Sequence, residues 1–211
     1  MAERGRPRSF ERAAALRRAM ELFWAKGFEG ASVAELTAVM GINSPSLYAA
    51  FGSKEALFRE AVALYGATEG GRIWSGLTGA PTARDAIAVM LRASAVDFSR
   101  PGKPRGCLIV LGALHAYGAN EAVRRDLAKQ RAENIVLLRQ RLERGVAEGE
   151  LPPGLDLQAI ATFYATVQHG MSIQARDGAS RKALIAIADC AMVAWDGLTD
   201  RAGSNRRPRK L

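Results

Sequence analysis

The segment SVAELTAVMGINSPSLYAAFGSKEALF, which begins at Ser32, contains three helix starts and two helix stops in a short length of chain. Its first four residues form a capping box, in which the Ser32 hydroxyl can accept a hydrogen bond from the amide of Glu35 while the Glu35 carboxylate reaches back. The glycines of the MGI and FGS triplets predict the ends of two helices. Ser44 and Ser53 predict the caps of the next helices, the first with a proline in its first turn. Two helices of about two turns each must therefore meet tightly, which predicts a helix–turn–helix.

Helices are also predicted on either side of this segment. Upstream, Leu16, Met20 and Phe23 recur at helical spacing over residues 10–26, and downstream a helix runs from Ser53 to about residue 65. A small core between the short helices is expected from Ala38, Met40, Ile42, Leu47 and Phe51. The outward face of the helix after Ser44 is formed by small residues, Ser46, Ala49 and Ala50. Its backbone can therefore approach a partner closely.

The rest of the chain is predicted to be helical as well. Hydrophobic periodicity and proline or glycine breaks predict helices over 83–99, 107–118, 121–148, 157–176 and 181–197. Asp156 and Ser180 are expected to cap the last two. Both of these helices are apolar nearly all round, so each must be covered on both sides. The simplest cover is the same helix pair from a second copy across a twofold axis, which predicts a homodimer.

The net charge of +9 is concentrated at the two ends of the chain. Residues 1–26 carry seven basic and three acidic side chains, and residues 201–211 carry five basic and no acidic ones, so the part between them is neutral. Basic ends predict either a polyanionic partner or tails that only aid solubility, and charge alone leaves both interpretations open. Residues 201–211 are expected to form a disordered tail.

Several classes of protein are disfavoured by what the sequence lacks. No apolar run approaches the roughly 18 residues that span a bilayer, and the charged N-terminus is unlike a secretory signal, so we expect a cytoplasmic protein without membrane contact. Cys107 and Cys190 are far apart, which fits a reducing compartment. Their spacings to His115 and His169 are not those of metal ligands, so no metal or other cofactor is expected. No nucleophile–base pair, paired-carboxylate motif or phosphate-binding glycine loop is present, which argues against an enzyme.

The helix–turn–helix segment resembles the DNA-binding domain of the TetR (tetracycline-repressor) family of one-component bacterial regulators. The matching pieces are the stretch LFWAKGFEGASV, Gly41 in the turn, and the block Tyr48, Phe51, Lys54 and Leu57. This resemblance covers about residues 9–69. The C-terminal part is similar to the family only in the number and order of its helices.

The resemblance implies an all-α fold of two domains. Residues 9–69 would form a three-helix DNA-binding domain with its helix–turn–helix at 32–51, and residues 70–200 a helical bundle for ligand binding and dimerisation. Thr37 departs from the family pattern, because alanine is usual four residues before the turn glycine. Threonine is small enough that we expect the same fold.

The resemblance also implies which residues face the bases of duplex DNA. The short helix after the turn would enter the major groove, where base edges would be approached by Asn43, Ser44, Pro45 and Ser46. These four include no arginine or glutamine. We therefore expect recognition to depend largely on phosphate contacts and on DNA shape.

Phosphate contacts are expected from three residues. Ser32 and Lys54, at helix N-termini, would bind phosphates through a hydroxyl or backbone amide and through an ammonium group. The Tyr48 hydroxyl would reach a phosphate or the surroundings of a thymine methyl, and the alternative is a tyrosine in the core. The arginines of the N-terminal stretch ERGRPR form an arm that could enter the minor groove or stay disordered.

In this family the C-terminal bundle contains a cavity, and an effector bound there changes the spacing of two DNA-reading heads. The candidate lining residues mix aromatic, soft and polar side chains: Trp74, Met90, Phe98, His115, Phe163, Tyr164, Gln168, His169 and Met171. Each of them could equally be an ordinary core or surface residue. Gly170 interrupts an apolar helix at a cost of about 1 kcal/mol relative to alanine, which a closely approaching helix or ligand would offset.

Cys107 is a second candidate for a sensing site. It is expected to open a helix just after Arg105, where the helix N-terminus and the neighbouring cation would lower the pKa of the thiol. A thiol sensor of oxidants or electrophiles is one interpretation. The alternative is a small buried hydrophobic residue.

These observations predict a homodimeric, sequence-specific transcriptional regulator, most simply a repressor that a small-molecule effector releases from a pseudo-palindromic operator. Three alternatives remain open. They are a small helical enzyme or ligand-binding protein without DNA function, a thiol-based regulator acting through Cys107, and a nonspecific polyanion or membrane-surface binder acting through its basic ends. Deleting residues 201–211 separates the last from a repressor, which would keep its sequence-specific binding.

Overall fold

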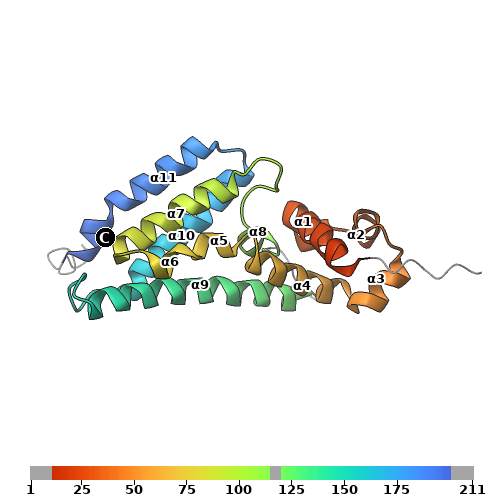
Figure 1. The fold of residues 1–211 in the computed structure, drawn as a ribbon, viewed down its shortest axis with the longest axis horizontal. Helices are drawn as coiled ribbons and strands as arrows, with labels where there is room; N and C mark the ends of the chain where they lie inside the picture. Colours follow the sequence, from red (N-terminus) through yellow and green to blue (C-terminus); the bar gives the residue numbers. More distant parts are fainter. Residues whose placement is uncertain (1–10, 115–119, 201–211) are drawn as a thin grey trace, which may run out of the picture.

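The structure is a computed structural model that describes residues 11–114 and 120–200. Within these two ranges the regular secondary structure is helical throughout, which confirms the predicted all-α fold. Figure 1 shows an elongated molecule in which α1, α2 and α3 gather at one end and longer helices run along the rest. The predicted N-terminal arm with Arg4, Arg6 and Arg8 lies outside the described residues, as does the basic tail at 201–211.

The first four helices form a unit that we call the head. Their bounds are α1 (Arg12–Gly30), α2 (Val33–Met40), α3 (Ser44–Phe51) and α4 (Lys54–Ala67). Aromatic rings join α1 to α4, because Phe58 lies edge-on to Phe23 and Phe28 with ring centroids 5.0 and 5.2 Å away. Edge-to-face pairs add about 0.5–1.5 kcal/mol to the effect of burial. These rings belong to a hydrophobic core that continues from the head into the rest of the molecule.

Helix α1 is interrupted near its end, where the sequence pattern predicts it to stop. Gly27 has φ 73° and ψ 175°, and a last short turn continues to Gly30. A Cβ added at Gly27 would meet the carbonyl oxygen of Gly112 at 3.1 Å. The position therefore requires glycine for its positive φ and for the close approach of the chain around Gly112.

The remaining helices form a second unit that we call the bundle. Their bounds are α5 (Gly71–Trp74), α6 (Gly76–Gly79), α7 (Ala83–Phe98), α8 (Leu108–Leu111), α9 (Glu121–Ala147), α10 (Leu157–Arg176), α11 (Arg181–Val193) and α12 (Trp195–Thr199). Helices α7, α9 and α10 agree with prediction to within a few residues. The predicted last helix is divided into α11 and α12, and only the first turn of the helix predicted at 107–118 is formed, as α8, before the undescribed residues. The sequence predicts no helix where α5 and α6 lie.

Two side-chain caps of the bundle are confirmed. The Asp156 carboxylate accepts a hydrogen bond from the amide of Ala159 at 2.9 Å, and the Ser180 hydroxyl accepts one from Ala183 at 3.2 Å. Each cap satisfies an amide that the first turn of α10 or α11 leaves without an intrahelical partner.

Helices α10 and α11 expose several apolar side chains. Phe163 and Ile173 on α10 are 38% and 45% exposed, and Val193 at the end of α11 is 81% exposed. Among the described residues no helix is both long and apolar enough to cross a membrane. Ile173 borders a groove beside Ile187 of α11, whereas Val193 borders a groove with Arg84 and Arg92 of α7.

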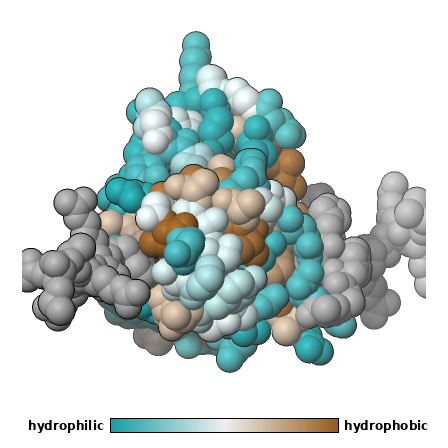
Figure 2. Space-filling view, turned by 90° about the vertical axis from the view of Figure 1, so that its right-hand side faces the viewer, coloured by the Kyte–Doolittle hydropathy of each residue, from teal (hydrophilic) through white to brown (hydrophobic). Residues whose placement is uncertain are grey.

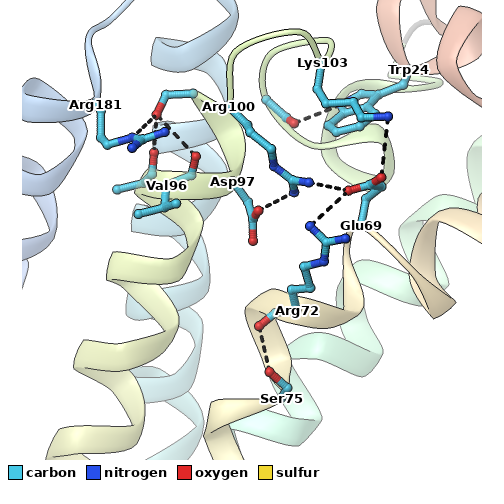
Figure 3. A network of polar contacts seen from close by, with 12 residues as sticks. Trp24, Glu69, Arg72, Ser75, Val96, Asp97, Arg100, Lys103 and Arg181 are labelled. Carbon is cyan, nitrogen blue, oxygen red and sulfur yellow. Dashed lines mark hydrogen bonds and ion pairs between the residues drawn. The ribbon is translucent and has the colours of Figure 1, made fainter.

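The head and the bundle are joined through a buried carboxylate, shown in Figure 3. Glu69, which follows α4, is 5% exposed and lies 2.7 Å from the Arg100 guanidinium, 3.6 Å from that of Arg72 and 3.7 Å from the Lys103 ammonium. Burial acts to raise the pKa of Glu69, but the hydrogen bond and charge of Arg100 and the other cations hold it below its ordinary value. Lys103 also reaches back to Glu21 of α1 at 2.5 Å.

Candidate nucleic-acid interface

Helices α2 and α3 lie at the end of the molecule that Figure 2 views face-on. Hydrophilic and pale residues cover most of this end, and strongly hydrophobic ones are confined to small patches. A surface of this kind suits a polar, hydrated partner such as a DNA groove.

The capping box that opens α2 is confirmed. The Ser32 hydroxyl accepts a hydrogen bond from the amide of Glu35 at 3.2 Å, and the Ser32 amide and hydroxyl both donate to the Glu35 carboxylate, at 3.1 and 2.8 Å. Lys26 of α1 also bonds to this carboxylate, and these contacts, led by that of Lys26, lower the pKa of Glu35 to about 2. A phosphate contact from Ser32 therefore requires Glu35 to release the donors that it holds.

The start of α3 corrects one predicted cap. Asn43, not Ser44, is the capping residue, and its side-chain oxygen accepts a hydrogen bond from the amide of Ser46 at 2.9 Å. The helix then begins at Ser44, with Pro45 in the second position of the first turn. Because a backbone amide can only donate, the atom of Asn43 that faces it must be the oxygen. The Asn43 amide group, with its two donors, is left facing outward.

Helix α3 buries one side and exposes the other, although Ala50, which was predicted to face outward, is half-buried and packs against the core. Leu47 and Phe51 are buried, whereas Tyr48 is 47% exposed, so the alternative of a core tyrosine is wrong. Ser44, Pro45 and Ala49 are exposed on the outer side, and Ser46 is half-buried. The small predicted core also includes Met40 and the partly buried Ile42, but Ala38 is exposed. One side of α2 therefore faces outward where the core was expected.

Thr37 fits at the position where the family usually has alanine. Its hydroxyl donates to the carbonyl oxygens of Val33 and Ala34, both at 2.9 Å, and the residue is 9% exposed. The buried hydroxyl is thus satisfied within its own helix. This departure leaves the helix–turn–helix geometry unchanged.

Lys54 begins α4 and lies against an aromatic ring. Its ammonium nitrogen is 4.4 Å from the centroid of the Phe28 ring, and partial burial lowers the pKa of Lys54 although Glu29 and Glu55 act in the opposite direction. A cation over an aromatic face is held in place by the ring quadrupole. The lysine is therefore positioned at the N-terminus of α4 before any phosphate arrives.

Arg12 holds α3 in place, although no sequence pattern points to it. Its guanidinium bonds both oxygens of Glu60 on α4 at 2.8 Å and lies 4.3 Å from the centroid of the Phe51 ring. It also donates to the carbonyl oxygen of Ala50 at 3.4 Å. One side chain of α1 thus ties α3 to α4.

The candidate ligand-binding residues are dispersed over the bundle. Trp74 lines a groove of about 250 Å³ between the α4–α5 segment and α9, together with Ile109, Asn134 and Leu137. Five of the candidate residues are buried, with 2% exposure or less: Met90, Phe98, Tyr164, Gln168 and Met171. Phe163 lies on the exposed face of α10, and His115 lies outside the described residues.

His169 and Gly170 occupy neighbouring positions on α10. His169 is half-buried, and burial, followed by the charge of Arg131, lowers its pKa. Gly170 lines a groove of about 440 Å³ with Val167, Ile173 and Ile187, and an added Cβ would meet no atom within 4 Å. Within one chain, therefore, no close neighbour requires this glycine.

The structure corrects the environment predicted for Cys107. The thiol is buried, and burial raises its pKa, although a hydrogen bond from the Tyr65 hydroxyl acts to lower it. The Arg105 guanidinium bonds the carbonyl oxygen of Ala179 and does not lower the thiol pKa as expected. The amides of Ile109 and Val110 at the start of α8 act to lower the thiol pKa, as expected for a helix N-terminus, but burial outweighs them. Across residues 11–114 and 120–200, no group of three or more His, Cys, Asp or Glu side chains is placed to hold a metal ion.

Comparison with known proteins agrees with this geometry. Residues 15–61 match the family described as "Bacterial regulatory proteins, tetR family", and residues 83–188 match "Tetracyclin repressor-like, C-terminal domain". Two Escherichia coli (strain K12) proteins are each 34% identical: the HTH-type transcriptional repressor ComR, over 92% of this chain and 93% of its own, and the repressor BdcR, over 87% and 88%.

A solved structure gives the same result. The TetR family transcriptional regulator CifR, in a cysteine-substituted form complexed with 26 bp double-strand operator DNA, is 50% identical with a TM-score of 0.87. The match covers 90% of this chain and 100% of that one. The chain therefore belongs to the TetR family, and it is a DNA-binding transcriptional regulator.

Proposed function

We propose that the protein is a homodimeric, sequence-specific repressor that binds a pseudo-palindromic operator. Residues 9–69 bind DNA in this proposal, and residues 70–200 dimerise and bind an effector. The observation that carries it is the geometry of α3, which presents a small, exposed side and is fixed from behind by Leu47, Phe51 and Arg12. The names of ComR and BdcR as repressors and the operator complex of CifR support this function.

The proposed DNA contacts follow from the positions of the side chains around α3. Asn43, Ser44, Pro45 and Ser46 face base edges at the N-terminal end of the helix. Tyr48, whose side chain is exposed, and Lys54, held over the Phe28 ring, contact phosphates. Ser32 contributes a phosphate contact only where Glu35 gives up its hydrogen bonds.

The proposed dimer forms through α10 and α11. These helices expose Phe163, Ile173 and Val193 and border the groove beside Gly170. A matching pair of helices from a second copy would cover this apolar face in an isologous interface. The open space above Gly170 would then admit a side chain of the partner.

The proposed effector is a small molecule bound in the bundle, and its binding weakens operator affinity. The groove beside Trp74 is a suitable place because Gly66 at the end of α4 and the α5 segment that follows form one wall, and α9 of the bundle forms the other. A ligand that prefers one separation of these helices shifts the position of the head by its differential affinity. Of the effector contacts predicted from sequence, Trp74 lines this groove. The others stay predictions that the groove does not include: Met90, Phe98, His115, Phe163, Tyr164, Gln168, His169 and Met171.

A second candidate places the sensing chemistry on Cys107, as a thiol-based sensor of oxidants or electrophiles. The feature that favours it is the Tyr65 hydroxyl beside the thiol, which acts to lower the pKa of Cys107. Burial opposes ionisation, so a reagent would reach this thiol only when the bundle opens. In both versions we propose a cytoplasmic regulator without catalytic activity.

The test is a gel shift with the DNA that flanks the protein's own gene. We expect a shift that competitor DNA of unrelated sequence does not remove, and its loss with one member of a small-metabolite panel. Loss of the shift with an oxidant, prevented by Cys107→Ser, would favour the thiol candidate. Turnover of a small molecule by protein that binds none of this DNA would contradict the proposal.

A further inference from the structure

The interruption of α1 exposes main-chain acceptors at its end. In an unbroken helix the amide of Phe28 would donate to the carbonyl oxygen of Trp24. Here it donates to the carbonyl oxygen of Gly112 instead, at 2.6 Å. The carbonyls at the end of the first part of α1 are thereby left for partners from outside the helix.

Arg176, the last residue of α10, supplies that partner. Its two terminal nitrogens donate to the carbonyl oxygens of Ala25 and Trp24, each at 2.7 Å, and its Nε donates to the carbonyl oxygen of Arg105 at 3.0 Å. A cation is favoured at a helix C-terminus, where the helix dipole is negative. The planar guanidinium holds these three hydrogen bonds in a fixed geometry, which a lysine ammonium on its flexible side chain cannot do.

Two further hydrogen bonds and a close approach of the backbone at Gly106 make this end of α1 a junction with the bundle. The Trp24 indole donates to the carbonyl oxygen of Gly106 at 2.9 Å, and the amide of Cys107 donates to the Ser172 hydroxyl on α10 at 2.8 Å. A Cβ at Gly106 would lie only 2.7 Å from the carbonyl oxygen of Ser172. The end of α1, the chain at 105–107 and the end of α10 are therefore packed against one another without space for adjustment.

We propose that Arg176 is a positioning residue for operator recognition. It joins the head directly to the helix that carries the proposed dimer face, and so it sets the angle and separation of two heads in a dimer. Those two quantities determine which spacing of operator half-sites can be bound. This inference rests on the proposed homodimeric repressor.

The experiment measures operator affinity as a function of half-site spacing. The full-length wild-type protein and Arg176→Gln are titrated against the operator from the gel shift and against versions with one or two base pairs added or removed at its centre. We expect the wild type to lose at least about tenfold in affinity on each change and Arg176→Gln to lose less than about threefold, because freely oriented heads accept several spacings.

Arg181→Gln is the matched control. Arg181 begins α11, and its Nε lies 3.4 Å from the Ser99 hydroxyl, away from α1. The affinity of Arg181→Gln should therefore depend on half-site spacing as that of the wild type does. Size-exclusion chromatography and circular dichroism verify that each variant is a folded dimer. Where Arg176→Gln does not fold, Arg176→Lys decides, because it keeps the charge but not the three-way bonding.

The outcomes separate the two proposals. A variant that loses affinity equally at every spacing, or that keeps the wild-type spacing profile, overturns the role of Arg176 and leaves the repressor proposal intact. A wild-type protein that binds no operator overturns the repressor proposal itself.

Discussion

The head and the bundle are stabilised in different ways. The helix–turn–helix of the head consists of two helices of eight residues each, α2 and α3, whose starts are fixed by Ser32 and Asn43, each of which accepts a hydrogen bond from an amide in the first turn. In the bundle, long helices bury apolar side chains against one another, as Leu138 and Leu142 of α9 do at 0% exposure. Short capped helices keep a small surface in a defined position, whereas long packed helices can slide or tilt and remain buried. The difference suits a recognition surface on one side and a responsive bundle on the other.

The largest expected effect comes from the same substitution made once in each region. Leu47 on α3 and Leu142 on α9 are both 0% exposed, so Leu47→Ala and Leu142→Ala should each cost about 2–5 kcal/mol of unfolding free energy. In Leu47→Ala we expect faster amide hydrogen exchange, measured by mass spectrometry, in residues 32–67 only. Equal loss of protection in α10 and α11 would show that head and bundle unfold as one unit.

The next effect separates binding from stability within the head. Tyr48→Ala combined with Lys54→Ala should weaken operator affinity by about a hundredfold, since two phosphate contacts are removed. Stability should fall by only about 0.5–1 kcal/mol, from the lost contact of Lys54 with the Phe28 ring. Fluorescence anisotropy and thermal unfolding measure the two quantities. Lys129→Ala on the exposed side of α9 is the control and should change neither, and a matching loss of folding in the double variant would rule out the assigned roles.

A smaller effect distinguishes the two ends of one side chain. Asn43→Ser keeps an oxygen that can cap α3 and should retain wild-type stability, whereas Asn43→Ala should lose about 0.5–2 kcal/mol. Both remove the outward amide, so both should lose about fivefold in operator affinity if that amide reads a base-edge acceptor. Thermal unfolding and anisotropy are again sufficient. Wild-type affinity in Asn43→Ser would limit Asn43 to its role as a cap.

The smallest expected effect is confined to the bundle and depends on pH. Burial lowers the pKa of His169 from its ordinary 6.5, so the folded protein binds this proton less readily than the unfolded chain does. Above pH 6.5 His169 is neutral in both states and does not reduce the free energy of unfolding. As the pH falls from 6.5 towards the lowered pKa, the unfolded chain takes up the proton first, so the free energy of unfolding should decrease. Denaturant midpoints of wild type and His169→Gln between pH 7 and pH 5 measure it, and parallel curves would contradict it.

The sequence predicted helix starts in both the head and the bundle because caps are local. At Ser32, Ser53 and Ser180 the cap is a hydrogen bond between the serine hydroxyl and the amide three residues later, so it can be predicted without knowledge of the rest of the chain. The error at Ser44 has the same origin, since asparagine and serine are equally good caps and stand side by side at 43 and 44. The long helices of the bundle were predicted from hydrophobic periodicity, which is also a local property of the sequence.

Properties that depend on distant neighbours could not be predicted. The pKa of Cys107 is set by burial, and Arg105 turns towards Ala179, 74 residues further along the chain, and not towards the thiol. Glu69 meets Arg100 across 31 residues, and Arg176 meets Ala25 across 151. Such pairs leave no periodic or spacing signal in the sequence. The dispersal of the candidate ligand residues has the same cause, because periodicity identifies a buried helix face but not the side chains that border a space.

The interruption of α1 at Gly27 has a consequence for building hybrid regulators. Joining the head of one family member to the bundle of another at the boundary between α4 and α5 would remove the native acceptors and donors that complete α1. The new bundle would have to place a carbonyl oxygen where Gly112 accepts the hydrogen bond from the amide of Phe28. It would also need an arginine at the position of Arg176, within reach of the carbonyl oxygens of Trp24 and Ala25. We expect grafts of this head to function only when the 105–112 segment and the last turn of α10 are transplanted with it.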